Sequence, residues 1–274
     1  MKFIFIFLFL FLISCNSIKV RKIELDTCQE LIGKIQKINS STYHYPIFEK
    51  DTNLLRKEKS TIFFDKKNNI LKKVDDSLEF PKETLYNYNN RLLESTISKC
   101  KNKIRKENYK YDKHNNLIEF NQFENDTISL SKTSIYDSKN NPIKKTYFHP
   151  NYKNKIRIDK YIYNYKKRMV IIQSFDENDK ANENFIKINY DKNGFIIKSD
   201  YMIKSLNKYY SSLTINQYDK KGNVIERTNY DRYGNPMGTT IYKNSYDKIG
   251  NIIVREIYYK DKLIEKSTYE IIYW

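Results

Sequence analysis

The chain has 274 residues and carries 50 Lys and Arg against 33 Asp and Glu, which gives a formal net charge of +17. Apolar residues make up only 39% of it and the mean hydropathy is −0.76, so the composition excludes a thick, dry interior. The 25 Tyr and 15 Phe still offer much surface to bury, because Tyr can bury its ring and keep its hydroxyl in water. We therefore expect a curved sheet, or two thin layers with one well-solvated face.

The chain opens with the pattern of a signal peptide. A single Lys2 precedes an unbroken run of Phe, Ile and Leu over residues 3–13. This run is too short to cross a bilayer, which needs about 20 residues. We assign residues 1–14 to a signal peptide.

The next residues resemble the cleavage box of bacterial lipoproteins, which reads Leu12-Ile13-Ser14-Cys15 here. The resemblance implies that Cys15 is acylated, and two or three acyl chains give a stable membrane anchor. Asn16 after the cysteine is consistent, by the same resemblance, with passage to the outer membrane, on either its periplasmic or its surface face. The alternative is an ordinary signal peptide followed by a chance cysteine.

The stretch from Asn16 to Arg21 is polar, and residues 15–25 are interpreted as a tether. Asp26 can cap a helix, and apolar residues then recur at helical spacing up to Ile38, which predicts one short amphipathic helix. Residues 39–53 suggest a loop or irregular strand. We expect residues 26–53 to cap one end of the sheet, and Trp274 to close the other.

One short phrase then recurs through the rest of the chain, with three good copies that begin at Tyr218, Tyr230 and Tyr246. Asp after the Tyr favours a type I turn, and the fourth residue after the Tyr must take positive φ. Gly and Asn tolerate that conformation best. The residues at this position are Asn68, Asn115, Asn140, Gly194, Gly222, Gly234 and Gly250. The pairs that define the four glycine turns are Asp191 with Gly194, Asp219 with Gly222, Asp231 with Gly234 and Asp247 with Gly250.

The intervals between these turns hold second, weaker turns. They predict on the order of 15 strands of ordinary length. The expected fold is all-β: a long antiparallel meander of repeated hairpins over residues 54–274.

The phrase Tyr-Asp-x-x-Gly-Asn with a following apolar pair is similar to the tyrosine-aspartate repeats of the Rhs and teneurin families. The similarity covers roughly residues 60–274 and implies hairpins that wind into a continuous sheet. The shells of those families are far longer and no toxin segment follows Trp274, so their enclosing role is not carried over. The resemblance also suggests carbohydrate binding, without assigning a residue.

Two sets of residues are candidates for function. Tyr190, Tyr218, Tyr230 and Tyr246 occupy equivalent positions, so they form either a ladder that stacks on sugar rings or a cover for the sheet. Cys28 and Cys100 form either a disulfide or two separate thiols. Lys is scattered through nearly every turn, which either attracts polyanions or keeps sheets from pairing with one another.

No catalytic or cofactor signature appears. The three His residues lie far apart, no zinc spacing or nucleophile elbow is present, and Asp176, Asn178 and Asp179 lack the Gly and distal Glu of a calcium loop. We therefore expect no metal, no cofactor and no enzyme activity.

The sequence favours a lipid-anchored envelope module that binds glycan or a partner protein through an aromatic, basic sheet face. The first alternative is a structural or immunity-like accessory protein that works by strand-edge or face contacts. The second is a hydrolase with an unrecognised site. Nucleic acid is an unfavoured partner because the predicted location is outside the cytoplasm. The sequence does not specify an oligomeric state.

Overall fold

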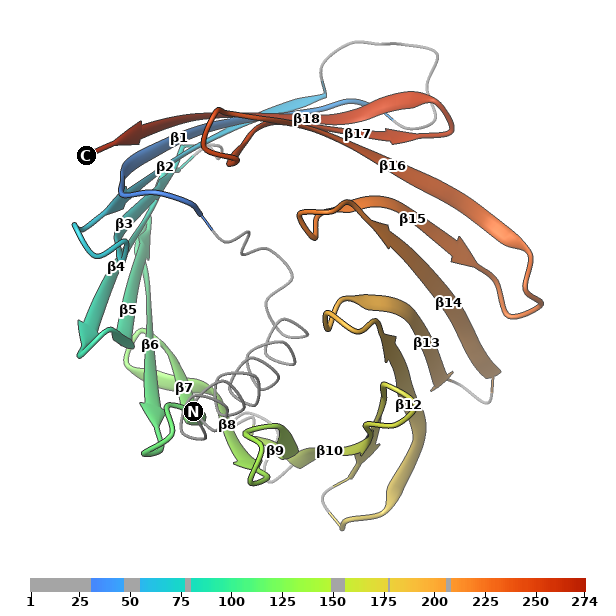
Figure 1. Ribbon diagram of the computed structural model, residues 1–274. Helices are drawn as coiled ribbons and strands as arrows, with labels where there is room; N and C mark the ends of the chain where they lie inside the picture. The colour runs from blue at the N-terminus through green and yellow to red at the C-terminus, as the bar shows by residue number, and fades with distance from the viewer. Residues whose placement is uncertain (1–30, 47–54, 77–79, 149–155, 177, 206–207) are drawn as a thin grey trace, which may run out of the picture.

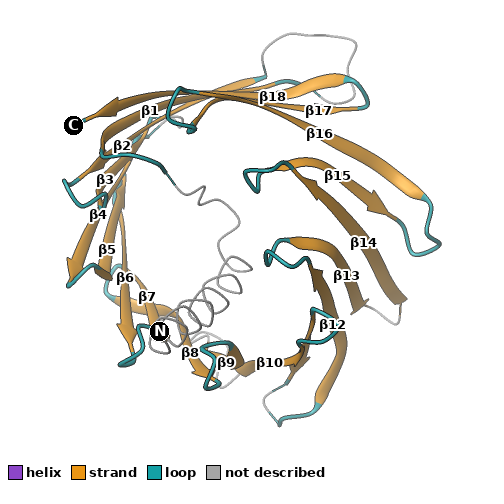
Figure 2. Ribbon diagram, viewed as in Figure 1, coloured by secondary structure: helices purple, strands orange, loops and turns teal. Residues whose placement is uncertain are grey.

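The computed structural model describes residues 31–46, 55–76, 80–148, 156–176, 178–205 and 208–274. Every regular element in these ranges is a strand (Figure 2). The strands are β1 (Ile35–His44), β2 (Arg56–Phe64), β3 (Ile70–Asp75), β4 (Lys82–Asn89), β5 (Leu92–Cys100), β6 (Lys103–Tyr111), β7 (Leu117–Glu124), β8 (Thr127–Tyr136), β9 (Pro142–Phe148), β10 (Ile156–Asn164), β11 (Met169–Phe175), β12 (Ala181–Tyr190), β13 (Ile196–Ser205), β14 (Lys208–Tyr218), β15 (Val224–Tyr230), β16 (Pro236–Tyr246), β17 (Ile252–Tyr259) and β18 (Lys262–Tyr273). Within the described ranges, no helix has the length and apolar character that a membrane crossing requires.

The 18 strands form one closed barrel (Figure 1). Each strand pairs antiparallel with the next along the chain, and β18 pairs with β1. The all-β prediction is confirmed. The expected open sheet with capped ends is wrong, because the first and last strands cover each other's edges.

Consecutive antiparallel strands place alternate turns at opposite ends of the barrel. The eight hairpins that join an even-numbered strand to the following odd-numbered strand therefore share one end, which we call the Asp-turn rim. Their loops are residues 65–69, 90–91, 112–116, 137–141, 165–168, 191–195, 219–223 and 247–251. The other turns lie at the opposite rim.

The recurring turn is held together by its own aspartate. In the hairpin after β14, the Asp219 carboxylate accepts the backbone N–H of Lys221 at 2.9 Å and of Asn223 at 2.8 Å. The Gly222 N–H donates to the Asp219 carbonyl at 3.1 Å, which requires the positive φ of 82° at Gly222. The six other positions predicted to be left-handed also have positive φ, between 61° and 108°.

One further copy of this turn lies at a position where the sequence predicted a second, weaker turn. Asp176 accepts the N–H groups of Asn178 and Lys180, and Asp179 takes the left-handed position with φ of 60°. Asp is less common than Gly or Asn in that conformation, so the sequence of this turn departs from the recurring phrase. The spacing that suggested a calcium loop therefore belongs to a turn.

The helix predicted from Asp26 to Ile38 is wrong over its described part. Residues 35–38 belong to β1, and Gly33 has φ of 91°. A β-bulge between Ile35 and Lys37 shifts the register by one residue, so Ile35 and Ile38 point to the same side of the strand and join one apolar cluster. A spacing of three residues on a bulged strand imitates the spacing of a helix. Part of the loop predicted after Ile38 is likewise strand, since β1 runs to His44.

The two ends of the barrel meet in a ninth copy of the turn, split between β18 and β1. Tyr273 pairs with Ile35, and the Trp274 N–H donates to the Lys34 carbonyl at 3.0 Å, as Asp219 N–H does to Asn223. Gly33 supplies the left-handed position. The seam therefore has hairpin geometry without a continuous chain.

The two faces of the wall differ in burial. Ser134 on β8 is 7% exposed, whereas its neighbour Ile135, which points to the other side, is 54% exposed. Ser134, Lys145 and Asp159 are in register across β8, β9 and β10, so they share the buried face. Residues 31–34 run on the inner side of the ring (Figure 1), and Gly33 lies against the ring of Tyr273, which belongs to the same buried face. We assign this face to the lumen. A barrel of 18 strands is too wide for its inward side chains to fill.

Candidate functional site

An aromatic belt lines the lumen at the Asp-turn rim. One aromatic residue stands at, or one position before, the end of every even-numbered strand: Phe64, Tyr88, Tyr111, Tyr136, Tyr163, Tyr190, Tyr218, Tyr246 and Tyr273. The Tyr218 hydroxyl donates to the carbonyl of Ile196 in the preceding hairpin at 2.7 Å, and Tyr136 bonds Leu117 in the same way at 2.9 Å. These two tyrosines of the belt therefore tie their hairpins to the preceding ones.

Near the seam the tyrosines reach the turn aspartates instead of the backbone. The Tyr246 hydroxyl donates to Asp219 at 2.6 Å and accepts the Asn223 amide at 2.9 Å. Burial, together with the hydrogen bond to Asp219, raises the pKa of Tyr246 to about 12. Burial alone would raise the pKa of Asp219, but the hydrogen bonds from Tyr246 and Asn223 outweigh it and lower that pKa.

The structure separates the four tyrosines predicted to form a ladder. Tyr190, Tyr218 and Tyr246 lie in the belt, each on the lumenal face. Tyr230 ends β15 at the opposite rim, and its register with Leu213 and Pro236 places it on the outer face. The same turn phrase serves both rims, so equal sequence position does not mean equal position in space.

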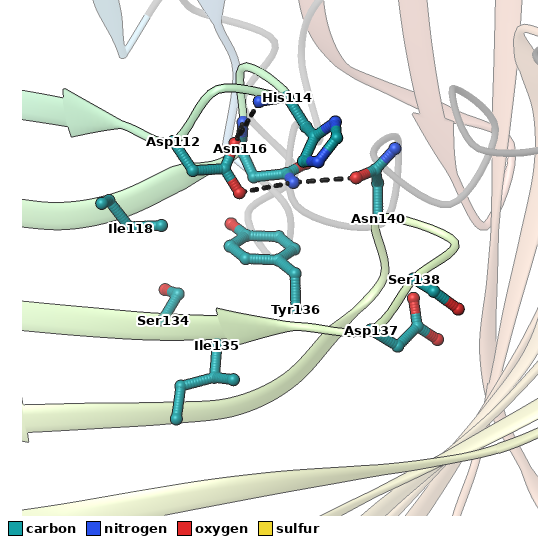
Figure 3. Close-up of a pocket in the computed structure, with 10 residues that line it drawn as sticks. All are labelled: Asp112, His114, Asn116, Ile118, Ser134, Ile135, Tyr136, Asp137, Ser138 and Asn140. Carbon is teal, nitrogen blue, oxygen red and sulfur yellow. Dashed lines mark hydrogen bonds between the residues drawn. The ribbon is translucent and has the colours of Figure 1, made fainter.

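A cavity of about 320 Å³ lies between two hairpins of the Asp-turn rim (Figure 3). Its walls include the turn residues Asp112, His114 and Asn140. Asn116 joins the two turns, since its amide donates to Asp112 and to Asn140, each at 2.9 Å. Asp112, Asn116 and Asn140 already form hydrogen bonds that hold the turns together. We therefore interpret the cavity as part of the structure of the rim and not as a ligand site.

Among the residues whose burial is described, the most buried charged side chains lie deeper in the lumen wall. Lys145 on β9 and Asp159 on β10 face each other in register and are 4% and 5% exposed. Asp159 accepts the Ser174 hydroxyl at 2.7 Å and the Arg157 guanidinium at 3.1 Å. Buried charges carry a large desolvation cost and mark candidate functional sites. We call these residues, with Tyr147 and Tyr161, the lumenal cluster.

Aromatic faces accompany the charges in this cluster. The Lys145 ammonium lies 5.3 Å from the ring centroid of Tyr161, and the Arg157 guanidinium carbon lies 4.3 Å from that of Tyr147. Burial lowers the pKa of Lys145 to about 8, although Asp159 opposes the shift. Burial also raises the pKa of Tyr161, so this hydroxyl stays a donor at neutral pH. The cluster thus combines aromatic faces with fixed donors and one acceptor, a set that can hold a sugar ring by stacking and hydrogen bonds.

Sequence reasoning missed the lumenal cluster. Lys145 is one of many lysines in the chain, and the cluster comes from three strands separated by turns. The only sequence signal was the alternation of residues 157, 159 and 161 on one face of a strand.

One histidine lies beside carboxylates. The two ring nitrogens of His44 lie 3.6 Å from Glu58 on β2 and 3.6 Å from Glu265 on β18. Among the contacts recorded for the described residues, none joins the His44 ring to a hydroxyl or thiol.

Several predicted residues lie outside the described ranges. These are the signal peptide and tether with Cys15, the cap residue Asp26, and Cys28. Cys100 ends β5, where its thiol lies 3.8 Å from the Phe80 carbonyl. The lipid anchor and the pairing of Cys28 with Cys100 stay predictions.

Comparisons with known proteins return solved structures only. No protein-family model matches the chain, and no curated protein matches it. A porin-like protein from Bacteroides uniformis has a TM-score of 0.45 and 11% identity over 88% of this chain and 98% of that one. A porin-like protein from Bacteroides vulgatus has a TM-score of 0.38 and 10% identity over the same shares. A chain of a TcdB2-TccC3-Cdc42 structure has a TM-score of 0.30 and 13% identity over 84% of this chain and 14% of that one. At these TM-scores the likeness carries no functional conclusion for this chain.

Proposed function

We propose that this protein is a lipid-anchored module of the cell envelope that binds glycan at the lumenal cluster. The observation that carries the proposal is the buried pair of Lys145 and Asp159, with the Tyr161 ring beside Lys145 and the Tyr147 ring beside Arg157, which donates to Asp159. Stacking on tyrosine and hydrogen bonds from fixed charged groups are the two contacts a sugar ring needs. The signal peptide and Cys15 support an envelope location, with the outer membrane as the favoured membrane.

The barrel stands in water beside the membrane in this proposal. Charged residues lie in mid-strand on both faces, including Lys106 and Lys187 on the outer one and Lys145 and Asp159 on the lumenal one. A Lys or Arg on a lipid-facing strand costs about 2 to 4 kcal/mol at the bilayer midplane. Neither face therefore suits a hydrocarbon core.

The closed barrel argues against an accessory protein that works by strand-edge contacts. Each of the described strands pairs on both sides, so none of them offers an open edge to a partner chain. A partner protein would have to use a face or a rim. Glycan is favoured over a protein partner because the strongest candidate site lines the lumen.

The experiment is a binding titration of the purified full-length protein with soluble cell-wall and lipopolysaccharide glycan fragments. Tyr161→Ala and Lys145→Gln should each weaken binding at least tenfold, because stacking or a charged hydrogen bond is lost from a buried site. Tyr230→Ala, on the outer face, is the matched control and should bind as the wild type does. Equal binding by all four proteins, or no binding to any fragment, would refute the proposal.

A further inference from the structure

The folded barrel gathers basic residues that the sequence scatters. The turns of the Asp-turn rim hold twelve exposed Lys and Arg residues, which we call the basic crown. They are Lys66, Lys67, Arg91, Lys113, Lys139, Lys166, Lys167, Arg168, Lys192, Lys220, Lys221 and Lys248. None of the ion pairs recorded among the described residues involves a member of the crown.

The six aspartates of the same turns offset only half of the crown's charge. Those six residues, Asp65, Asp112, Asp137, Asp191, Asp219 and Asp247, direct their carboxylates at their own backbone amides. The described loop residues of the opposite rim hold four basic and six acidic side chains. These are Lys101, Lys180, Arg232 and Lys260 against Asp76, Asp126, Asp176, Asp179, Asp231 and Asp261. Among the described turns, positive charge is therefore concentrated at the Asp-turn rim.

Exposed apolar side chains stand directly behind and within the crown. Ile135 and Ile162 lie on the outer wall next to the rim, because their strand neighbours Ser134 and Tyr161 face the lumen. Further exposed apolar side chains stand at the bulges beside the rim turns, at Leu71, Ile143, Ile197 and Ile225. Tyr165 and Ile249 lie in the rim turns themselves and are 41% and 47% exposed. A basic edge with apolar side chains behind it is the composition of surfaces that rest on a lipid headgroup layer.

The N-terminal chain enters the barrel at the same rim. The Asn251 side chain accepts the Ile32 N–H at 2.7 Å and donates to the Ile32 carbonyl at 2.8 Å. From the other side of the seam, Asn68 accepts the Ile35 N–H at 3.0 Å and donates to the Gly33 carbonyl at 2.7 Å. Two turns of the rim thus fix the point at which the chain that follows Cys15 joins the fold.

We propose that the basic crown docks the Asp-turn rim on the anionic surface of a lipid membrane. The inference rests on the proposed lipid anchor, which places that surface within reach of the rim. Each lysine near such a surface contributes about fivefold in affinity, and a lipid chain combined with a polybasic surface binds more durably than either alone. Docking turns the opposite rim away from the membrane.

The test is flotation of the full chain with vesicles of neutral phosphatidylcholine, with and without anionic phosphatidylglycerol. The crown variant carries Lys67→Gln, Lys113→Gln, Lys192→Gln and Lys220→Gln, at four positions without recorded side-chain contacts. The control carries Lys59→Gln, Lys99→Gln, Lys103→Gln and Lys106→Gln, which remove the same charge from exposed sites away from the crown. All proteins keep the same N-terminus, so its own insertion contributes equally.

The crown variant should lose at least about tenfold in affinity for the anionic vesicles, while the control variant loses less than about threefold. Both should match the wild type on neutral vesicles, and salt should weaken the wild type on anionic ones. Equal losses in the two variants, or tighter binding to heparin than to anionic vesicles at equal charge, would overturn the proposal. Mass spectrometry of Cys15 tests the anchor separately. An unmodified Cys15 refutes the lipid anchor alone. Equal losses of vesicle affinity in the two variants, found together with an acylated Cys15, refute the docking alone.

Discussion

Replacing the turn glycines with alanine separates the cost of backbone conformation from the cost of packing. Gly234 has φ of 84°, and a Cβ there would meet nothing within 4 Å. The change Gly234→Ala should therefore cost only the left-handed strain of about 1 to 2 kcal/mol. Part of this is offset by the lower entropy of the unfolded alanine chain, about 0.4 to 1 kcal/mol.

Gly222 has nearly the same φ of 82°, but a Cβ there would overlap the Phe195 ring. That ring stacks on Tyr218 with centroids 5.0 Å apart, and displacing it adds about 0.5 to 1.5 kcal/mol. We expect Gly222→Ala to destabilise more than Gly234→Ala. Asn tolerates left-handed backbone, so Gly234→Asn should cost less than either.

The assay is urea unfolding followed by tyrosine and tryptophan fluorescence, with the midpoint compared across the three variants. The expected order of destabilisation is Gly222→Ala, then Gly234→Ala, then Gly234→Asn. A stabilising Gly234→Ala would refute the left-handed turn. Equal effects of the two alanines would refute the contact with Phe195.

Tyr246→Phe removes the hydroxyl that joins Asp219 to Asn223 and should cost about 1 kcal/mol in urea unfolding, with Tyr230→Phe near zero as its control. Hydrogen bonds hold the pKa of Asp219 below its ordinary value of 3.8. The ionised carboxylate therefore stabilises the fold above pH 3.8, and this stabilisation is lost as the pH falls through the lowered pKa of the folded state. Thermal unfolding of wild type and Asp219→Asn from pH 5 to 2 checks this, and parallel curves would contradict it. Lys145 has a folded pKa of about 8 against 10.5 unfolded, so the folded state binds fewer protons between these values and stability rises with pH there. This rise in the free energy of unfolding should be absent in Lys145→Met. If the free energies of unfolding of wild type and Lys145→Met differ by a constant amount from pH 7.5 to 9.5, the result would argue against a buried ammonium.

The turns were predictable from sequence because their chemistry is local. Asp at the first position, and Gly or Asn at the left-handed position, are demanded by atoms within five residues of one another, as at Asp219 and Gly222. The strand β1 was not predictable in the same way. Its bulge after Ile35 is set by pairing with Tyr273, at the far end of the chain.

The features that bear on function arise from closure of the ring. The lysines of the basic crown alternate in sequence with those of the opposite rim, and only the antiparallel path sorts them to one end. The sequence placed Tyr230 and Tyr218 on one face because the same repeated phrase occurs in the turns of both rims. The pair of Lys145 and Asp159 depends on the register between β9 and β10.

Closure of β18 on β1 is the claim on which the lumen, the two rims and the basic crown all depend. Thr42 and Ser267 face each other across this seam, with their hydroxyl oxygens 3.0 Å apart. The most direct measurement is mild oxidation of the double variant Thr42→Cys with Ser267→Cys, followed by peptide mapping under non-reducing conditions. A disulfide between positions 42 and 267 within one chain is the predicted result. No such link, or a link found only between two chains, would contradict the closed barrel.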